Sequence, residues 1–340
     1  MRHALAVRQD NNGDVILAGP AIRGLAAAFD RVTVLCSPHG EAAARLLPGV
    51  DAVVVARTEW IDAAPRRIDR AATLALVDRI AALRVDDAFV FGSFHQSPLP
   101  TALVLRLAGV PRVHAVSVDY PGSLLDTRAA APDDNHEVER NLRLLAAAGI
   151  PPPPDDRLEL QALPARDRSL PESYVVVHPG ATVPARAWSA DKNRSLVAAL
   201  AARGERVLVT GSAAERALCA FVSDGEATVV CDRSFAAYAA VVRDARAIVV
   251  GNTAGAHVAA AVGTPVVSLF APTIPPVRFR PWRVPHALLG VHGIACAGCR
   301  ARTCPIPGQP CLGDVEVAEV LAALSELAPA NRAAVAAVRR

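Results

Sequence analysis

One stretch of the chain decides its fold: residues 247–257 read Ala-Ile-Val-Val-Gly-Asn-Thr-Ala-Gly-Ala-His. The apolar run Ala247–Val250 predicts a strand that is buried on both faces, and the small residues after it predict a tight turn into a helix. Another apolar run, Pro265–Phe270, follows that helix. A strand, a turn, a helix and a second strand in this order form the βαβ unit of a parallel sheet.

The same alternation continues through the chain, which predicts an α/β protein with doubly wound parallel sheets. The expected strands are Ala4–Val7, Arg31–Cys36, Ala52–Val55, Asp87–Phe91, Val113–Val116, Tyr174–His178, Arg206–Thr210, Ala227–Cys231, Ala247–Val250 and Pro265–Phe270. A stiff run of prolines at 151–154 interrupts the pattern near its middle. We therefore expect two domains, residues 1–165 and 166–340, each of ordinary domain size.

Composition limits the classes of function. Hydrophobic residues make up 52% and charged residues 20% of the chain, so both domains can bury full cores. The formal net charge of +3 is too small to indicate a nucleic-acid partner. The first residues lack the apolar core of a secretory signal, and polar residues and glycines interrupt the longest apolar tract, 247–271. We expect a soluble, cytoplasmic protein without an integral membrane segment.

Four of the seven cysteines cluster near the carboxyl end with the spacing Cys-x2-Cys-x4-Cys-x6-Cys. They are Cys296, Cys299, Cys304 and Cys311. Such a cluster can hold a structural metal, form disulfides, or remain as free thiols that shape a loop, and the spacing leaves these alternatives open.

A carboxylate follows the first expected strand. The chain reads Gln-Asp-Asn-Asn-Gly-Asp over residues 9–14, before a helix that we expect to begin near Val15. Gly and Asn tolerate the positive φ of a tight turn. Asp14 can be the N-cap of that helix, or it can act as a general base, because the carboxyl ends of parallel strands line the ligand crevice. The chain contains no G-x-G-x-x-G dinucleotide motif.

This turn begins a resemblance to glycosyltransferase family 9. The segments that resemble the family, in the family's order, include Gly13-Asp14-Val15, Pro20-Ala21-Ile22-Arg23, Leu46–Asp51 and His136–Arg140. In that family the aspartate of Gly-Asp-Val is the proposed catalytic base, which implies this role for Asp14 and an acceptor-side position for Asn12 and Gly13. His95 and Gln96, after the fourth expected strand, suit recognition of acceptor hydroxyls, although a solvated loop fits them equally well.

Two turns of the second half also resemble family elements. His178-Pro179-Gly180, followed by Arg186-Ala187-Trp188, is similar to an element whose basic residue contacts the donor phosphates. The resemblance gives that contact to Arg186, since arginine can bind phosphate through two hydrogen bonds; the alternative is a surface arginine. A second turn resembles one whose glutamate contacts the nucleotide ribose, and its candidates are Gly211, Ser212 and Glu215, together with Gly180. Glu215 can instead be a first-turn glutamate that the helix dipole stabilises.

The stretch quoted first carries the strongest local signal for phosphate. Amides at a helix start that is free of bulky side chains bind phosphate oxygens. The candidates are Asn252, Thr253, Ala254, Gly255 and His257. Many family members have aspartate where Asn252 stands and Gly-Pro at 254–255, so this chain keeps the amide cradle but lacks that carboxylate. His257 is either a buried capping residue or a catalytic one.

The resemblance covers nearly the whole chain and implies the GT-B architecture, two facing Rossmann-like domains with parallel sheets. It implies an inverting glycosyltransferase that moves heptose from the nucleotide sugar ADP-heptose and requires no metal or other cofactor. The acceptor would be a hydroxyl of a glycan, a lipid-linked molecule or a small molecule, with peripheral contact to the inner face of the membrane. A GT-B sugar-nucleotide epimerase or hydrolase, which needs no acceptor, is the alternative.

Overall fold

The computed structural model describes residues 1–62, 65–93, 96–130 and 134–329. The chain divides into two compact units, Met1–Gln161 and Ala162–Arg340, whereas the sequence placed the division after residue 165. Each unit contains one parallel six-stranded sheet. Among the described residues, no helix is both long enough and apolar enough to cross a membrane.

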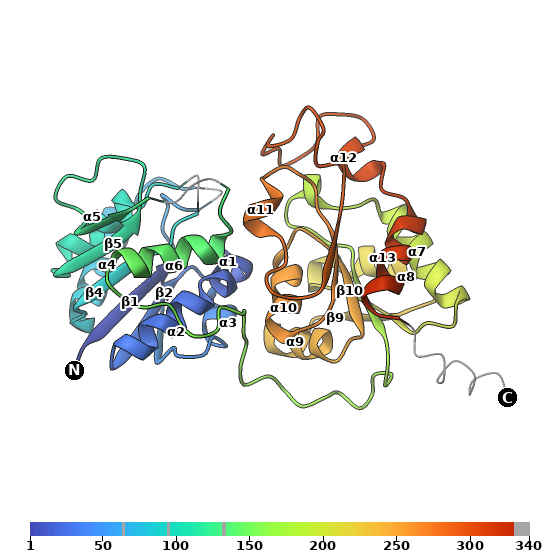
Figure 1. Cartoon of the computed structure of the whole chain (residues 1–340), viewed down its shortest axis with the longest axis horizontal. Helices are drawn as coiled ribbons and strands as arrows, with labels where there is room; N and C mark the ends of the chain where they lie inside the picture. The colour runs from blue at the N-terminus through green and yellow to red at the C-terminus, as the bar shows by residue number, and fades with distance from the viewer. Residues whose placement is uncertain (63–64, 94–95, 131–133, 330–340) are drawn as a thin grey trace. The chain divides into compact units, whose positions relative to one another are not determined.

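The sheet of the amino-terminal domain, coloured blue to teal in Figure 1, has the strand order β3-β2-β1-β4-β5-β6. Its strands are β1 His3–Arg8, β2 Arg31–Cys36, β3 Ala52–Val55, β4 Asp87–Val90, β5 Arg112–Val116 and β6 Thr127–Ala129. Every residue of β1 is buried, as the uninterrupted apolar run predicted for a central parallel strand. The strand β6 was not predicted, because Thr-Arg-Ala is a short edge strand without an apolar run.

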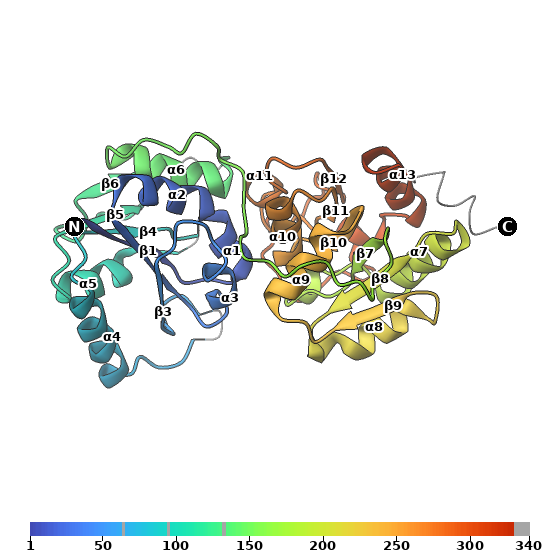
Figure 2. The ribbon, with the colours of Figure 1, turned by 90° about the horizontal axis from the view of Figure 1, so that it is seen from below.

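Helices cover both faces of this sheet. They are α1 Asn12–Leu17, α2 Gly19–Ala28, α3 Glu41–Ala44, α4 Arg70–Leu83, α5 Leu99–Leu107 and α6 Glu137–Ala147. Figure 2 shows α2 and α6 on one face and α4 and α5 on the other. The α4–α5 face contributes Leu76, Ile80 and Leu105 to an apolar core that also contains Leu5 and Val7 of β1.

The expected start of the first helix was wrong. The helix α1 begins at Asn12, not near Val15, and its N-cap is Asn11 in an extended conformation, with φ of −86° and ψ of 172°. No residue between 9 and 14 has a positive φ. The Asn-Asn-Gly sequence suggested a left-handed turn, but the chain enters the helix directly from the extended residue.

The carboxyl-terminal domain repeats the topology, with the strand order β12-β11-β10-β7-β8-β9. Its strands are β7 Val175–His178, β8 Val207–Gly211, β9 Thr228–Cys231, β10 Ala247–Gly251, β11 Val266–Leu269 and β12 His286–Leu289. Its helices are α7 Ala190–Ala202, α8 Arg216–Ser223, α9 Phe235–Arg243, α10 Ala254–Val262, α11 Pro276–Phe279, α12 Pro310–Gly313 and α13 Val317–Leu327, with 3-10 turns at Pro184–Arg186 and Ala213–Glu215.

Both sheets place the first strand of the domain in the middle, with the next two strands on one side and the last three on the other. This is the order of the dinucleotide-binding Rossmann fold. Successive strands are added first toward one edge of the sheet and then toward the other. This switch point lies between β1 and β4 in one domain and between β7 and β10 in the other. Ligands of such sheets bind at this point, beyond the carboxyl ends of the strands.

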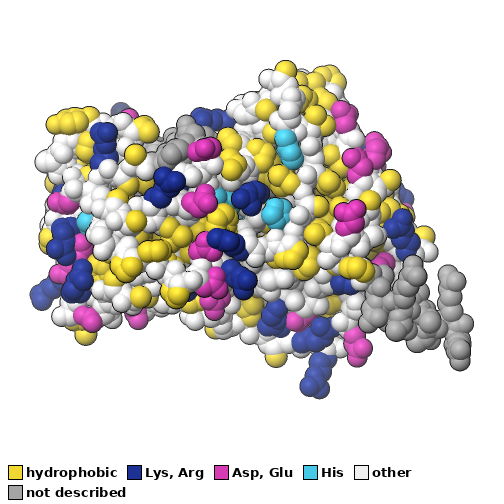
Figure 3. Space-filling model, in the orientation of Figure 1, with side chains coloured by type: hydrophobic (Ala, Val, Ile, Leu, Met, Phe, Trp, Pro, Cys, Tyr) yellow, Lys and Arg dark blue, Asp and Glu magenta, His cyan; other side chains and the backbone are white. Residues whose placement is uncertain are grey.

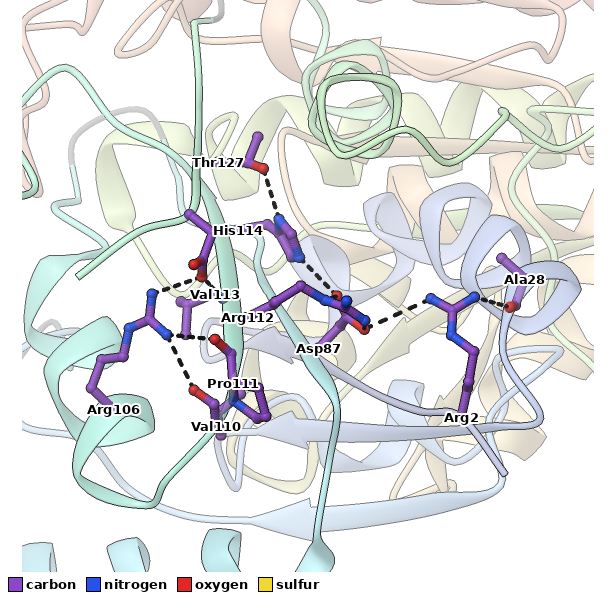
Figure 4. A network of polar contacts seen from close by, with 11 residues as sticks. Arg2, Ala28, Asp87, Arg106, Val110, Pro111, Arg112, Val113, His114 and Thr127 are labelled. Atoms are coloured by element: carbon purple, nitrogen blue, oxygen red, sulfur yellow. Dashed lines mark hydrogen bonds and ion pairs between the residues drawn. The ribbon is translucent and has the colours of Figure 1, made fainter. Parts of the chain in front are cut away.

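A polar network fastens the opposite, amino-terminal edge of the first sheet (Figure 4). Asp87 accepts two hydrogen bonds of 2.6 Å from the Arg112 guanidinium, and His114 Nε2 lies 3.0 Å from its Oδ1. Burial alone would raise the pKa of Asp87, but the hydrogen bonds from Arg112 and His114 lower it.

On the molecular face seen in Figure 3, basic and acidic side chains are interspersed, in keeping with the small net charge.

Candidate functional site

The switch point of the second sheet brings three of the predicted turns together. His178, the last residue of β7, is paired with Val250 of β10, so the turns that begin at Pro179 and Asn252 leave the sheet side by side. The neighbouring strand β8 ends at Gly211, directly before Ser212. Residues far apart in the sequence therefore meet at one edge, as the sequence predicted from strand ends alone.

The helix α10 begins at this edge. Thr253 is its N-cap, and the Thr253 Oγ1 accepts a hydrogen bond of 3.3 Å from the Gly255 amide. Thr253 and Ala254 are partly exposed, so the positive end of the helix dipole is open to a ligand. His257 is only 5% exposed and lies within the helix, so it is a buried helical residue and not the cap. Asn252 is 4% exposed, and within the described part of the chain its Nδ2 has no hydrogen-bond partner.

The half-buried Arg186 lies on a 3-10 turn that passes close to the end of β10. A Cβ added at Gly251 would come within 2.8 Å of the Arg186 carbonyl oxygen, so glycine is needed for this approach. The turn is held from outside by the cysteine-bearing loop: the Ala185 amide donates to the Arg302 carbonyl, and Gln309 Nε2 donates to the Ala185 carbonyl at 2.9 Å. This bracing was not predicted from the sequence.

Trp188 anchors the chain directly after that turn. Its side chain is 3% exposed, and its Nε1 donates a hydrogen bond of 3.3 Å to the Val315 carbonyl. The Arg186 backbone is thus fixed on both sides. Gln309 binds the preceding residue, Ala185, and the Trp188 ring anchors the chain after Arg186.

Glu215 has a fixed carboxylate at the end of β8. Its Oε2 accepts hydrogen bonds of 2.8 Å from both the amide and the hydroxyl of Ser212 in a capping box. Its Oε1 lies directly over Gly180, where a Cβ would overlap it. Burial works to raise the pKa of Glu215, but the Ser212 hydrogen bonds and the nearby His178 lower it. The capping role is therefore real, and it leaves Oε1 facing the switch point.

His178 and Tyr238 line the same corner as neutral groups. The His178 Nδ1 lies 3.0 Å from the Thr210 hydroxyl oxygen, and its ring stands 5.5 Å from the Tyr238 ring. Burial lowers the pKa of His178, against a smaller opposing effect of Glu215. Burial also raises the pKa of the Tyr238 phenol. Of these three side chains, Glu215 is therefore the charged one.

In the amino-terminal domain, Asp14 lies at the switch point between β1 and β4. It is the third residue of α1, and its side chain is 24% exposed. Its Oδ1 accepts a hydrogen bond of 3.0 Å from the Arg8 guanidinium at the end of β1. The role of N-cap belongs to Asn11, so the structure does not use Asp14 as a cap.

Arg8 is the centre of an ion-pair cluster that the sequence did not reveal. Its side chain is fully buried, with Asp10 Oδ2 at 2.8 Å from Nε and Glu137 Oε2 at 3.5 Å from one terminal nitrogen. Burial works to lower the pKa of Arg8, and the carboxylates of Asp10, Asp14 and Glu137 raise it above its ordinary value. The sequence carries one signal of this cluster: the charged Arg8 directly follows the apolar run Ala4–Val7, where a buried charge is rare and needs a partner.

The other acceptor-side candidates are distributed around this cluster. Gln96 Nε2 donates a hydrogen bond of 2.5 Å to Asp10 Oδ1, which joins the loops after β1 and β4. Asn12 Oδ1 accepts a hydrogen bond of 3.0 Å from the Ala43 amide, so this side chain fastens α1 to α3. Gly13 is buried within α1, and His95 lies outside the described residues.

The four clustered cysteines follow β12. Cys311 is buried in α12, Cys299 is exposed, and all four are free thiols. Burial raises the pKa of Cys311, and the neighbouring Cys304, Cys296 and Cys299 act in the same direction. Across the described ranges, no group of three or more His, Cys, Asp or Glu side chains is arranged to hold a metal ion.

The carboxyl-terminal domain has the start of α10, the half-buried Arg186 and the fixed Glu215 at its switch point. Together with a second Rossmann-like domain, this arrangement is typical of the class of proteins that bind nucleotides or their sugar derivatives. The family model of glycosyltransferase family 9 (heptosyltransferase) matches residues 95–309. The chain belongs to this family.

Two curated relatives are similar over part of their length. Lipopolysaccharide heptosyltransferase 3 of Escherichia coli is 32% identical over 176 residues, which are 46% of this chain and 49% of the relative. Lipopolysaccharide heptosyltransferase 1 of Pseudomonas aeruginosa is 35% identical over 185 residues, 50% of this chain and 48% of the relative. The chain thus spans about half the length of the curated relatives that it matches.

The fold is similar to that of a solved family structure over almost its whole length. The structure of E. coli ADP-heptose lipopolysaccharide heptosyltransferase II aligns with a TM-score of 0.73 at 18% identity, covering 96% of this chain and 98% of that chain. The expected GT-B fold, built from two Rossmann-like domains with parallel sheets, is confirmed.

Proposed function

We propose that the chain is an inverting glycosyltransferase that moves a sugar from a nucleotide diphosphate to an acceptor hydroxyl in the cytoplasm. The observation that carries this proposal is the edge at β7 and β10, where the open start of α10, Arg186 and Glu215 converge in a family 9 chain. The most direct donor is ADP-heptose, because the structurally similar E. coli enzyme is named for that donor.

In this proposal the donor diphosphate binds to the start of α10. The residues from Asn252 to Gly255 supply backbone amides and the helix dipole, and Arg186 supplies a full positive charge. Glu215 Oε1 accepts a hydrogen bond from the ribose. Gly180 and Gly211 leave room for the Glu215 carboxylate, and Ser212 fixes it by hydrogen bonds. No metal or other cofactor takes part, since arginine and the helix amides neutralise the leaving group. His257 stays a structural residue, in keeping with its burial.

The chemistry needs a base for the acceptor. Asp14 Oδ2 takes the proton of the acceptor hydroxyl as its oxygen forms a bond to the anomeric carbon, and the bond from that carbon to the diphosphate oxygen breaks with its electrons. Attack from the face opposite the leaving group inverts the anomeric configuration. The nucleoside diphosphate leaves with its new negative charge stabilised by Arg186 and the α10 amides. Gln96, in the loop after β4, contacts the acceptor.

For the acceptor, we propose a glycan of the cell envelope, reached through peripheral contact with the membrane. The support is that both curated relatives are lipopolysaccharide heptosyltransferases. A lipid-linked or small-molecule acceptor would use the same base and the same donor site.

Thermal-shift binding of ADP-heptose and of GDP-, UDP- and dTDP-sugars, on wild type and on Asp14→Asn, tests the proposed donor site. We expect both proteins to bind one donor equally well, because Asp14 is assigned to the acceptor. Failure of wild type to bind any nucleotide would contradict the donor site.

A further inference from the structure

We propose that Arg8 is a positioning residue for the reaction: it holds one oxygen of Asp14 and leaves the other free to take the acceptor proton. The inference rests on the proposed function, because it assumes that Asp14 is the base. It adds a role for the buried cluster of Arg8, Asp10, Asp14 and Glu137, which is called the Arg8 cluster below.

The contacts of the Arg8 cluster are not equivalent. The Arg8 guanidinium lies within ion-pair distance of all three carboxylates, but the one aligned hydrogen bond that it donates to them goes to Asp14 Oδ1. Asp14 is also the most exposed of the three, at 24% against 12% for Asp10 and 0% for Glu137. Within the described residues, Asp14 Oδ2 accepts no hydrogen bond. One oxygen is therefore fixed by Arg8, and the other is left for a further hydrogen bond.

Arg8 is itself held from behind. Asp10 is linked through Gln96 to the loop after β4, since Gln96 Oε1 also accepts a 2.9 Å hydrogen bond from the Ser93 amide. Glu137 is completely buried in the first turn of α6, where the helix dipole favours its negative charge. That turn has its own capping box between His136 and Glu139. The guanidinium therefore has little freedom to follow a moving Asp14.

A structural explanation alone does not account for this arrangement. A buried arginine needs one or two carboxylates for compensation, and Asp10 and Glu137 already supply them. A third carboxylate at the switch point is useful if it serves the ligand, and Arg8 then limits its rotation.

The test is a double-mutant cycle on the turnover number. Arg8→Gln should lower kcat about 10- to 100-fold, part of the about 10²- to 10⁴-fold contribution of a positioned base, with the affinity for ADP unchanged. In an Asp14→Asn background, Arg8→Gln should cause no further loss, because Arg8 acts only through Asp14. Arg112→Gln, which breaks an arginine–carboxylate pair at the far edge of the same sheet, is the matched control and should keep wild-type kcat.

Glu137→Gln covers the case in which Arg8→Gln does not fold. It keeps the guanidinium and removes the negative charge of one side chain that holds it, so kcat should fall by a smaller factor, and that factor should also vanish in the Asp14→Asn background. Independent, multiplying losses in the double variants would overturn the positioning role and leave the glycosyltransferase proposal intact. Full activity of Asp14→Asn alone would instead overturn the assignment of the base, and with it this inference.

A readout without substrate completes the test. In crystal structures, the Asp14 side chain should leave its rotamer in Arg8→Gln or Glu137→Gln and keep it in Arg112→Gln. An unmoved Asp14 in both cluster variants would overturn the inference even if no donor were turned over.

Discussion

Replacing Gly180 by alanine adds a single atom, the Cβ, next to Glu215 in the proposed donor site. A Cβ at this position would lie 2.5 Å from Glu215 Cδ and overlap Oε1, so the carboxylate must rotate away from the switch point. The rotation breaks the two 2.8 Å hydrogen bonds from Ser212 and removes Oε1 from the place assigned to the ribose. Loss of one hydrogen bond to a charged group corresponds to about 1.5–3 kcal/mol. The Kd for ADP should therefore rise about 10- to 100-fold.

Isothermal titration with ADP measures this change directly. Gly293→Ala is the control, because a Cβ there meets no atom within 4 Å and the backbone is not left-handed, so ADP binding should be unchanged. Glu215→Gln should weaken ADP binding as well, since a neutral amide accepts the ribose hydrogen bond less strongly. Gly180→Ala with wild-type affinity for ADP would refute the assignment of Glu215 to the nucleotide.

Three further predictions concern the phosphates, the bracing loop and pH. Arg186→Gln should weaken ADP binding about 10- to 100-fold in titration calorimetry and leave adenosine binding unchanged, since only the phosphate contact is lost; equal losses for both ligands would contradict it. Gln309→Ala should weaken ADP binding by a smaller factor, because the turn that carries Arg186 loses its bond to the cysteine-bearing loop, and an unchanged Kd would show that the bracing has no effect. Unfolding in urea should show constant stability above about pH 7 and falling stability below about pH 6.5. Burial lowers the pKa values of His3 and His178 in the folded protein, so the unfolded chain binds protons first as the pH falls. Rising stability on acidification would contradict the assignment.

Much of the fold was predictable because parallel strands buried on both faces read as short apolar runs. All ten predicted strands are present, within a residue or two of their expected bounds. The two strands that were missed, β6 and β12, are edge strands, which need no apolar residues on both faces. The start of α1 was misplaced because the sequence Asn-Asn-Gly fits both a left-handed turn and a helix start.

The candidate site was predictable wherever one turn makes it. The phosphate loop at Thr253 and the turn at Glu215 are local, and a strand end followed by small residues indicates each of them. The Arg8 cluster was not predictable in this way, because Glu137 reaches Arg8 only through the packing of α6 near the end of β1. The bracing of the Arg186 turn by Gln309 depends in the same way on a loop more than a hundred residues further along the chain.

In a glycosyltransferase, turnover of the donor requires an acceptor. Release of free ADP from ADP-heptose should be measured with wild type, in the presence and absence of a lipopolysaccharide-core acceptor. ADP release is expected only when the acceptor is present, and it should be lost in Asp14→Asn. Release from the donor alone that persists in Asp14→Asn would contradict the account and indicate a sugar-nucleotide hydrolase or epimerase.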